Sequence, residues 1–250
     1  MTSISIIIPV LNETKTIAQT ISTAQTATDI EIIVVDGGSN DGTVELAQSL
    51  DVQLISTFPG RATQMNQGAM AATGDILIFL HGDTLLPPGF DRLVREALLN
   101  ANTIAGAFEL GIRGTERSLR IVEKMVNWRS RYLQIPYGDQ GIFLKAKIFQ
   151  EVGGFPEIPI MEDFELIRQL RKKGRIAIVS VPVLTSGRRW QKLGVLKTTI
   201  INQIVIIAYL LGVSPEILAQ WYRGHIKQGI RKNQSGESKE ITNSKNYLTK

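Results

Sequence analysis

Four short, mostly apolar runs separated by helix-like stretches constrain the fold of this chain more than any other feature of its sequence. The runs are rich in β-branched residues, as expected of parallel strands that are buried on both faces. They are Ser5–Ile8, Glu31–Val35, Val52–Ile55 and Ile76–Leu80. The helical stretches between them are Thr14–Ala27, Thr43–Leu50 and Ala62–Ala72. This alternation predicts right-handed βαβ units and a doubly wound α/β sheet.

The segments that follow three of these runs carry acidic residues. In a doubly wound sheet, ligands bind in the crevice at the carboxyl ends of the strands. Residues 9–13, 36–43 and 81–84 occupy these positions, and each segment contains at least one acid. A structural turn needs glycine and a cap, but it does not need an acid each time. We therefore predict a polar ligand crevice here, with Asn12 and Asp41 placed as helix N-caps.

The second half of the chain is less regular. We expect a strand at Thr103–Ile112, a helix at Glu116–Arg131 and a strand at Gly141–Leu144. A helix at Met161–Lys173 begins with acids and ends with bases, which matches the helix dipole at both ends. A further strand is expected at Ile176–Val183.

The last part of the chain predicts a helical extension. Leu193–Val213 is strongly apolar, but its longest uninterrupted stretch, Ile204–Val213, is shorter than the roughly 20 apolar residues that span a bilayer. We interpret it as a helix that packs on the domain or lies at a membrane surface. A second helix is expected at Pro215–Gly229. The predicted boundaries are a domain at 1–190, an extension at 191–230 and a disordered, lysine-rich tail at 231–250.

The composition excludes several kinds of site. The chain has no cysteine and two histidines, so disulfides, thiolate zinc sites and cysteine nucleophiles are excluded. Its net charge of +5 is small and scattered, which argues against a nucleic-acid partner but suits anionic substrates or an acidic membrane surface. The absence of cysteine and of a signal-peptide pattern at the N-terminus predicts a cytoplasmic protein, with peripheral contact to the inner face of the cell membrane as an option.

The three strand-end segments together resemble the motifs of family 2 glycosyltransferases, which have the GT-A fold. The similar stretches are Ser-Ile-Ile-Ile-Pro-Val-Leu-Asn-Glu at 5–13, Val-Asp-Gly-Gly-Ser-Asn-Asp-Gly-Thr at 35–43 and Leu-His-Gly-Asp-Thr at 80–84. The resemblance covers residues 4 to about 190. Further motifs resemble those of a small bacterial subgroup: Gly60–Arg61, Gln64–Ala69, Tyr137–Gln140, Met161–Asp163 and Ser186–Trp190.

This resemblance implies a GT-A-type, mainly parallel mixed sheet flanked by helices. It also implies an inverting enzyme that moves one sugar from a nucleotide-diphosphate sugar to a hydroxyl acceptor, with a lipid-like acceptor as one option. The implied donor-binding residues are Pro9, Asn12, Glu13, Asp36, Arg61, His81 and Asp83.

The chemistry of these donor residues agrees with that assignment. Asp36 can accept hydrogen bonds from a base N–H or a ribose hydroxyl, and Asn12 and Glu13 can do the same for the ribose. Arg61 can reach a phosphate or the base. The alternatives are that Asp36 and Asn12 only cap helices and that Arg61 is an ordinary surface arginine.

Asp83 matches the last acid of the family's Asp-x-Asp motif, whereas His81 replaces the first acid. A divalent cation such as Mg²⁺ often binds through one or two carboxylates together with substrate phosphates, so Asp83 can suffice. His81 can assist if the metal is Mn²⁺, or it can be a neutral packed histidine. The metal would stabilise the charge on the leaving diphosphate.

Asp163 matches the family's general base, which takes the proton of the acceptor hydroxyl during a single inverting displacement. Glu162 beside it can raise its pKa through like-charge proximity, although both acids can instead complement the helix dipole. Asp139 matches a position near the acceptor or sugar.

Arg188, Arg189 and Trp190 resemble a shortened Gln-x-x-Arg-Trp motif of processive members. These side chains suit contacts to a diphosphate and to a sugar face. The glutamine and a multi-span pore are absent from the sequence, which predicts one sugar per event.

Other α/β enzymes fit less well. No G-x-G-x-x-G follows the first strand and no P-loop motif occurs, which argues against a dinucleotide-dependent oxidoreductase and a nucleotide triphosphatase. A nucleotidyltransferase of related fold and a non-catalytic nucleotide-sugar-binding protein remain as alternatives.

Overall fold

The structure is a computed structural model that describes residues 2–225. One compact unit ends at Ser186 and a second begins at Gly187. The predicted tail at 231–250 and the end of the predicted helix at 215–229 lie outside the described residues.

In chain order, the first unit contains β1 (Ile4–Val10), α1 (Ile17–Ala24), β2 (Ile30–Asp36), α2 (Thr43–Gln48), β3 (Gln53–Ser56), α3 (Arg61–Ala71), β4 (Ile76–Phe79), β5 (Thr84–Leu85), α4 (Phe90–Ala97), β6 (Thr103–Arg113), α5 (Arg117–Leu133), the 3₁₀ turn η1 (Gly138–Gln140), β7 (Ile142–Lys145), α6 (Ala146–Glu151), α7 (Glu162–Arg171) and β8 (Arg175–Ser186).

The strands of the first unit form one sheet with the order β3-β2-β1-β4-β7-β6-β8-β5. β3, β2, β1 and β4 are parallel to their neighbours, as the βαβ alternation predicted. β7 is antiparallel to both β4 and β6, whereas β8 runs parallel to β6. The predicted mainly parallel, mixed α/β sheet is therefore confirmed.

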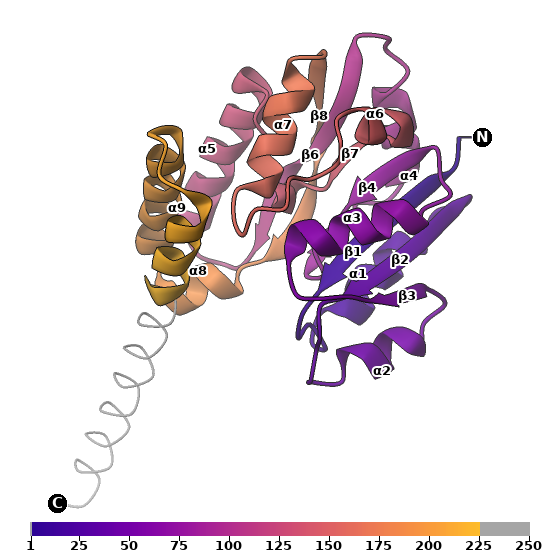
Figure 1. Cartoon of the computed structure of the whole chain (residues 1–250), viewed down its shortest axis with the longest axis horizontal. Helices are drawn as coiled ribbons and strands as arrows, with labels where there is room; N and C mark the ends of the chain where they lie inside the picture. The colour runs from indigo at the N-terminus through magenta and orange to yellow at the C-terminus, as the bar shows by residue number, and fades with distance from the viewer. Residues whose placement is uncertain (1, 226–250) are drawn as a thin grey trace, which may run out of the picture. The chain divides into compact units, whose positions relative to one another are not determined.

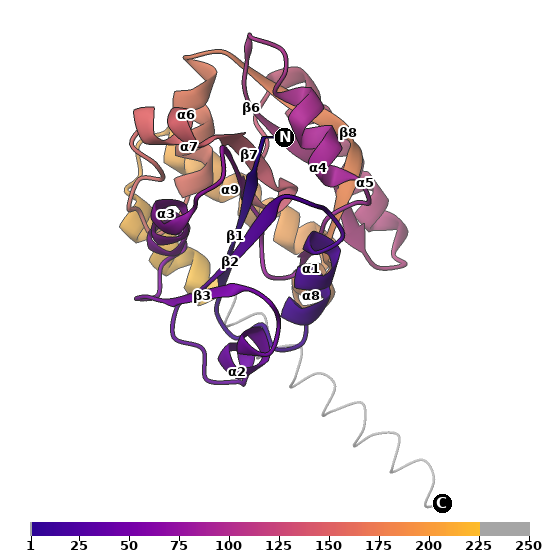
Figure 2. The same cartoon turned by 90° about the vertical axis from the view of Figure 1, so that its right-hand side faces the viewer.

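Two apolar cores lie on opposite faces of this sheet. One face packs against α1 and α4, through side chains such as Ile21 and Phe90. The other packs against α3, α6 and α7, through side chains such as Met65, Phe149 and Leu166. Figure 2 shows these two groups of helices on either side of the strands.

Helix α3 lies against β1 and β2 (Figure 1). A Cβ added to Gly68 would lie only 2.5 Å from Ile7 Cγ2 and 3.0 Å from Val35 Cγ2. A glycine at this position therefore allows the helix backbone to approach β1 and β2 closely, which sets the height of Arg61 and Gln64 above the strand ends.

One edge of β6 is completed by side chains. β7 pairs only with Ala105 and Gly106 of β6, so in the described chain the following residues of that edge have no strand partner. Asn127 of α5 instead bonds both backbone groups of Leu110, at 2.8 and 3.0 Å. The same edge receives hydrogen bonds between Gln140 and the Phe108 carbonyl, and between Glu123 or Arg120 and the backbone of Ile112. These contacts fix α5 to the sheet because they satisfy otherwise open backbone groups.

The N-cap predictions need correction. Helix α1 begins later than expected, with Thr16 as its N-cap, so Asn12 does not cap it. Asn12 has a positive φ of 58° and accepts a hydrogen bond from the Asn40 N–H at 2.9 Å, which ties it to the neighbouring loop. Gly42 is the N-cap of α2, although the Asp41 carboxylate still accepts the Thr43 N–H at 3.1 Å.

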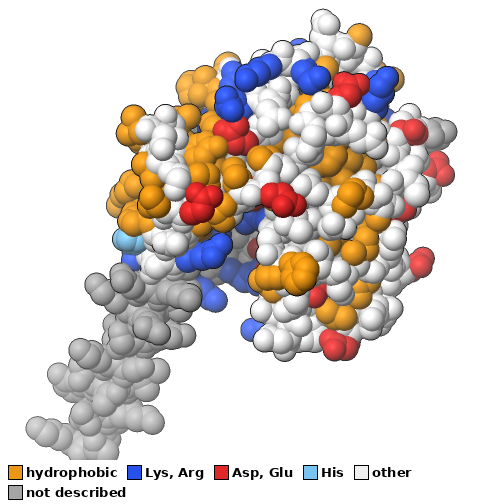
Figure 3. Space-filling model, viewed as in Figure 1, with side chains coloured by type: hydrophobic (Ala, Val, Ile, Leu, Met, Phe, Trp, Pro, Cys, Tyr) orange, Lys and Arg blue, Asp and Glu red, His pale blue; other side chains and the backbone are white. Residues whose placement is uncertain are grey.

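The second unit contains α8 (Arg188–Leu193), α9 (Val195–Leu210) and a helix that continues from 215 to the last described residue, 225. Exposed apolar side chains run along α9, including Leu196, Ile200, Ile207 and Leu210. Figure 3 shows hydrophobic side chains gathered over this helix. Among the helices of residues 2–225, none is long and apolar enough to cross a membrane.

Candidate active site

The segments after β1, β2 and β4, at residues 9–13, 36–43 and 81–84, are called here the strand-end loops. Asp36, the last residue of β2, is buried, and its carboxylate accepts the Gly38 N–H at 2.8 Å and the Ser39 N–H at 3.1 Å. Gly38 has a φ of 96°, which lets the chain turn back over the carboxylate. The Asp36 side chain is thus held in one orientation at the carboxyl end of the strand.

Gln64 joins the ends of β1 and β2 from above. Its side-chain nitrogen donates to the Val10 carbonyl at 2.8 Å and to the Val35 carbonyl at 2.7 Å. The amide is buried and lies 3.1 Å from the position that a Cβ on Gly37 would take. The sequence singled out Gln64 only as part of a motif, whereas the structure shows that it fixes the spacing of two strand-end loops.

The first two strand-end loops interlock. The Ser39 hydroxyl accepts the Asn12 N–H at 2.8 Å, and the Thr43 hydroxyl accepts the Glu13 N–H at 2.8 Å. The Glu13 carboxylate accepts the Thr16 hydroxyl at 2.7 Å. Both predicted ribose ligands therefore belong to a preformed loop pair.

The third strand-end loop lies beside the first. A Cβ on Gly82 would lie 3.4 Å from Glu13 Cγ and 3.6 Å from the Pro9 carbonyl oxygen. The Gly82 carbonyl accepts the Thr20 hydroxyl at 3.1 Å, which anchors this loop to α1. The structure thus brings Pro9, Glu13 and the His81–Asp83 turn together, as the shared strand ends predicted.

Gly138 marks the point where this third loop meets two other segments. A Cβ on Gly138 would lie 3.1 Å from His81 Nε2 and 3.1 Å from Asp163 Oδ2. These two atoms are therefore no farther apart than twice that distance. The geometry joins the end of β4, the turn η1 and the start of α7, which are far apart in the sequence.

Asp163 is the second residue of α7, and both of its carboxylate oxygens are engaged. Oδ2 accepts the Gly138 N–H at 2.7 Å, and Oδ1 accepts the Phe164 N–H at 2.7 Å. The N-terminus of a helix also favours a negative side chain. The half-buried Asp163 carboxylate is therefore held in place by backbone donors from two segments.

Glu162, next to Asp163, is linked to α3 through Arg61. Arg61 Nη1 lies 3.2 Å from Glu162 Oε1, and the side chains are 47% and 5% exposed, respectively. Burial raises the pKa of Glu162, which the Arg61 charge opposes and the Asp163 charge reinforces. The ion pair orients Arg61 and leaves part of its guanidinium accessible to a ligand.

Two residues that the sequence analysis did not assign stand beside the acids. The guanidinium carbon of Arg129 lies 3.5 Å from the centroid of the Tyr137 ring, and Arg129 Nε donates to the Ile135 carbonyl at 3.0 Å. Burial lowers the Arg129 pKa, whereas the charges of Tyr137, Asp139 and Asp163 raise it. Arg129 therefore compensates acidic charge inside the site.

The Tyr137 phenol responds to the same neighbours. Burial raises its pKa, the Arg129 charge lowers it, and Asp163 and Asp139 raise it further. Arg129, Tyr137, Gly138, Asp139 and Asp163 form what we call the Gly138 cluster.

The buried side chain of Gln140 supports the Gly138 cluster from below. Its oxygen accepts the Ser130 hydroxyl at 2.8 Å and its nitrogen donates to the Phe108 carbonyl at 2.9 Å. Its oxygen also accepts the Tyr137 N–H at 3.2 Å. These bonds fix η1 between α5 and β6, and thereby fix the position of Asp139.

A sequence signal for Arg129 existed. Arg129 and Arg131 are two residues apart on a helix, so they point in different directions. Arg131 pairs with Glu109, whereas Arg129 points toward Tyr137. The periodicity of α5 therefore separates the directions of the two arginines, but it does not identify Tyr137 as the partner of Arg129.

Arg188, Arg189 and Trp190 lie at the start of α8, in the second unit. Within that unit, the Arg189 guanidinium carbon is 5.5 Å from the Tyr222 ring centroid. All three predicted residues therefore belong to a different unit from the strand-end loops and the Gly138 cluster.

The described residues contain no group of three or more histidines and acids arranged to hold a metal ion. They do offer Asp83 and His81, two residues apart on one turn whose His81 carbonyl accepts the Thr84 N–H at 3.1 Å. A hard divalent cation commonly takes one or two protein carboxylates and completes its shell with substrate phosphates. The donor set therefore fits a site that a diphosphate completes, and it does not fit an all-protein metal cage.

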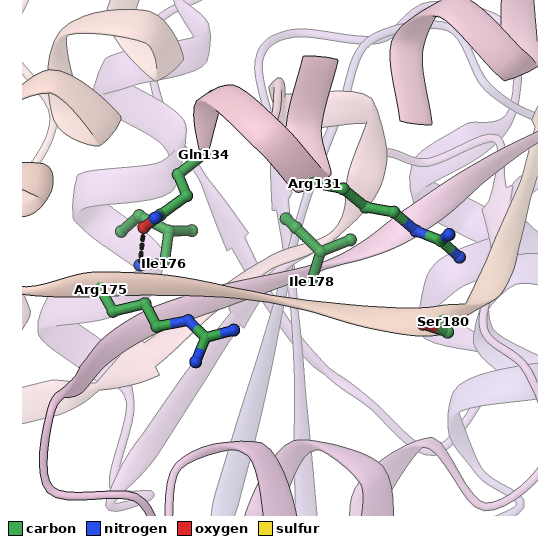
Figure 4. A pocket seen from close by; sticks show the side chains of 6 residues that line it. All are labelled: Arg131, Gln134, Arg175, Ile176, Ile178 and Ser180. Carbon is green, nitrogen blue, oxygen red and sulfur yellow. Dashed lines mark hydrogen bonds between the residues drawn. The ribbon is translucent and has the colours of Figure 1, made fainter. Parts of the chain in front are cut away.

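A cavity of about 250 Å³ lies elsewhere, between the end of α5 and β8 (Figure 4). It is lined by Arg131, Gln134, Arg175, Ile176, Ile178 and Ser180. Gln134 accepts the Ile176 N–H at 2.9 Å across one side of it. None of its lining residues is a predicted site residue.

The first unit of the chain matches a known protein family. The family model for Glycosyl transferase family 2 matches residues 5–153. Glycosyltransferase AglE of Haloferax volcanii is 36% identical over 91 residues, which are 32% of this chain and 30% of that protein. The undecaprenyl-phosphate 4-deoxy-4-formamido-L-arabinose transferase of Pseudomonas fluorescens is 30% identical over 146 residues, 53% of this chain and 40% of that protein. The chain thus spans well under half the length of these two relatives.

Among solved structures, the mannosyltransferase PcManGT from Pyrobaculum calidifontis, in complex with GDP-Man and Mn²⁺, superposes with a TM-score of 0.59. The match covers 100% of this chain and 81% of that one, at 18% identity. This likeness shows the fold, and it confirms the GT-A-type architecture that the strand-end motifs predicted.

Proposed function

Because the chain belongs to glycosyl transferase family 2, we propose that it transfers one sugar from a nucleotide-diphosphate sugar to a hydroxyl acceptor, with inversion and with Mg²⁺ or Mn²⁺. The observation that carries this proposal is the meeting at Gly138 of the third strand-end loop and the start of α7. This geometry supports the proposal, because a base at Asp163 would lie close to the loop that carries the candidate metal ligand.

The strand-end loops supply the donor site. Asp36 is oriented by two backbone N–H groups and is suited to accept a hydrogen bond from the base or the ribose. Asn12 and Glu13 flank the ribose, and Pro9 forms the wall beside Gly82. Because these loops are cross-linked before any ligand arrives, little ordering is needed when the donor binds.

The diphosphate lies over Asp83 and His81, with Arg61 beside it. Asp83 would hold a divalent cation, whose positive charge would stabilise the leaving diphosphate. Arg61 is half-exposed and is oriented by Glu162, so its guanidinium can form charge-assisted hydrogen bonds with phosphate oxygens.

Asp163 acts as the general base. The acceptor oxygen attacks the anomeric carbon, the bond to the diphosphate oxygen breaks on the opposite face, and the acceptor proton passes to Asp163. Two N–H donors hold the carboxylate in a fixed position, which favours a productive geometry. Asp139 binds the sugar or the acceptor, and Arg129 balances the negative charge that gathers in the cluster.

The acceptor and the second unit complete the proposal. Arginine suits contacts to a diphosphate and tryptophan suits a sugar face, so we also propose Arg188, Arg189 and Trp190 as ligands of these groups in a single, non-processive transfer. The exposed apolar side chains of α9 suit peripheral contact with the inner face of the cell membrane. The likeness to an undecaprenyl-phosphate transferase is a reason to include lipid-linked acceptors in the assays.

A thermal-shift panel tests the donor site directly. UDP- and GDP-linked sugars are added with EDTA, Mg²⁺ or Mn²⁺, because a ligand that binds only the folded state raises the Tm. One donor is expected to raise the Tm only with metal, and the metal-dependent part of the shift should disappear in Asp83→Ala. Asp75→Ala, which alters an acid on the opposite end of β4, is the control. A wild-type chain that binds no nucleotide sugar under any condition would refute the proposal, and donor binding without turnover over all acceptors would favour a non-catalytic binding protein.

A further inference from the structure

The outward face of α5 carries a continuous row of large apolar side chains. They are Ile121, Met125, Trp128 and Tyr132, which we call the α5 apolar row, and each is between 56% and 71% exposed. Their spacing of four, three and four residues puts them on one side of the helix. The rings of Trp128 and Tyr132 lie 5.7 Å apart, so the row ends in an aromatic pair.

A row of basic residues runs next to it. Arg117, Lys124 and Arg131 are exposed and follow one another at intervals of seven residues, or about two helical turns, and of these Arg131 is ion-paired with Glu109. At 100° per residue, this basic row lies directly beside the α5 apolar row. The acid Glu123 faces away from both rows, because its carboxylate accepts the Ile112 N–H and pairs with Arg120.

The fold of the first unit does not require these exposed side chains. The inward face of α5 already buries Leu119, Val122 and Ser130, and Asn127 completes the edge of β6. Four large apolar side chains in one exposed row are unusual for a surface with no partner.

The basic row indicates which kind of partner this surface binds. A symmetric dimer through this face would pair the same patch with itself, and it would bring basic residues of two copies together. An anionic lipid surface instead offers hydrocarbon for the apolar row and negative headgroups for the basic row. Trp and Tyr are also the residues enriched where a protein meets the headgroup region.

We propose that the outward face of α5 is a docking surface for an anionic lipid bilayer. Helix α5 lies in the plane of the interface, with Trp128 and Tyr132 at the level of the headgroups and Arg117 and Lys124 against lipid phosphates. This surface belongs to the first unit and is distinct from the apolar side chains of α9. The proposal does not depend on glycosyl transfer, because it concerns only where the chain binds.

Vesicle co-sedimentation of the full chain tests this docking. Phosphatidylcholine vesicles are compared with vesicles that contain about one third phosphatidylglycerol. We expect binding only to the anionic vesicles, and binding that weakens with salt. Met125→Ser/Trp128→Ser and Arg117→Glu/Lys124→Glu should each weaken binding at least about tenfold. Leu99→Ser and Lys172→Glu change exposed residues in the turns that follow α4 and α7, and binding should stay within about twofold of the wild type.

Direct contact is tested by tryptophan fluorescence. In the variant Trp190→Phe/Trp221→Phe, Trp128 is the remaining tryptophan. Bromine-labelled phosphatidylglycerol should quench its emission, whereas brominated phosphatidylcholine alone should not. Circular dichroism verifies that each variant is folded.

Three results would overturn the proposal. One is unchanged vesicle binding by both folded α5 variants. Another is an unquenched Trp128 in vesicle-bound chain. The third is a dimer, detected by light scattering, that Met125→Ser/Trp128→Ser converts to a monomer.

Discussion

The strand-end loops and the Gly138 cluster are built in different ways. In the strand-end loops, polar side chains bond to backbone groups of the same or the neighbouring loop, as Asp36 and Asn12 do. In the Gly138 cluster, the partners come from α5, η1 and α7, and buried charges face one another. The comparison indicates that hydrogen bonds among neighbouring strand ends preform the proposed donor side, whereas the proposed catalytic side depends on the packing of distant segments.

This difference predicts where substitutions act. Changes in the Gly138 cluster should lower turnover while the donor still binds. Changes that loosen the strand-end loops should lower stability and donor affinity together.

The largest effect is expected for Asp163→Asn. The amide keeps the size of the side chain but cannot accept the acceptor proton, so turnover should fall by about 10³-fold, within the range of general-base catalysis. Nucleotide release measured with a saturating donor checks this, and donor affinity should change less than about twofold. Asp51→Asn, an exposed loop acid, is the control. A loss of turnover smaller than about tenfold would remove Asp163 from the role of base.

A smaller loss of turnover is expected for Gly138→Ala. The added methyl would lie 3.1 Å from both His81 Nε2 and Asp163 Oδ2, so one of these groups must move. Turnover should fall by about 30-fold, since small displacements in an active site are costly. Gly224→Ala, where a Cβ meets no atom within 4 Å, is the matched control. Equal activity of Gly138→Ala and the wild type would show that the cluster tolerates repositioning.

On the donor side, Gln64→Met should act mainly on stability. Methionine fills a similar volume but leaves the Val10 and Val35 carbonyls without their side-chain donor, at a cost of about 2 kcal/mol. The Tm should fall by about 4–8 °C, and donor affinity should fall with it. Gln67→Met, an exposed position on the same helix, is the control. A stable variant that loses only turnover would contradict the proposed division between the two regions.

The smallest effect is expected for Glu162→Gln, and it depends on pH. Burial raises the pKa of Glu162 above its ordinary value of 4.5, so the folded chain holds this proton more tightly than the unfolded chain does. The free energy of unfolding of the wild type should therefore fall as the pH rises from 4.5 through the folded-state pKa of Glu162. Glutamine does not ionise, so the variant should not lose this stability as the pH rises. The Tm of Glu162→Gln relative to the wild type should rise between pH 4 and 8. A relative Tm that falls with pH would show that the Arg61 ion pair outweighs burial.

The strand-end loops could be predicted from sequence because their signals are local. Buried strands read as apolar runs, and the acids and glycines that follow β2 and β4 mark the carboxyl edge. Asn12 was misplaced as an N-cap because its positive φ and its bond to Asn40 depend on the neighbouring loop. The local sequence pattern therefore predicts where a loop lies, but it predicts less well which contacts the loop residues make.

The Gly138 cluster depends on contacts that no local pattern contains. Arg129 and Asp163 are brought together by the packing of α5 and η1, and Gln140 holds that arrangement through Ser130 and Phe108. Strand β5 was likewise not expected, because Thr84 finds its partner Thr185 about a hundred residues later. Asp163 itself was found through a resemblance of motifs, which carries tertiary information that periodicity lacks.

A crystal structure of the chain with its best donor and Mn²⁺ tests the convergence of the two regions most directly. We expect the nucleoside at Asp36, the cation between Asp83 and the diphosphate, and the Asp163 carboxylate facing the anomeric carbon from the side opposite the diphosphate. A donor bound instead in the cavity between Arg131 and Arg175, with Asp163 out of reach of the sugar, would contradict the proposed active site.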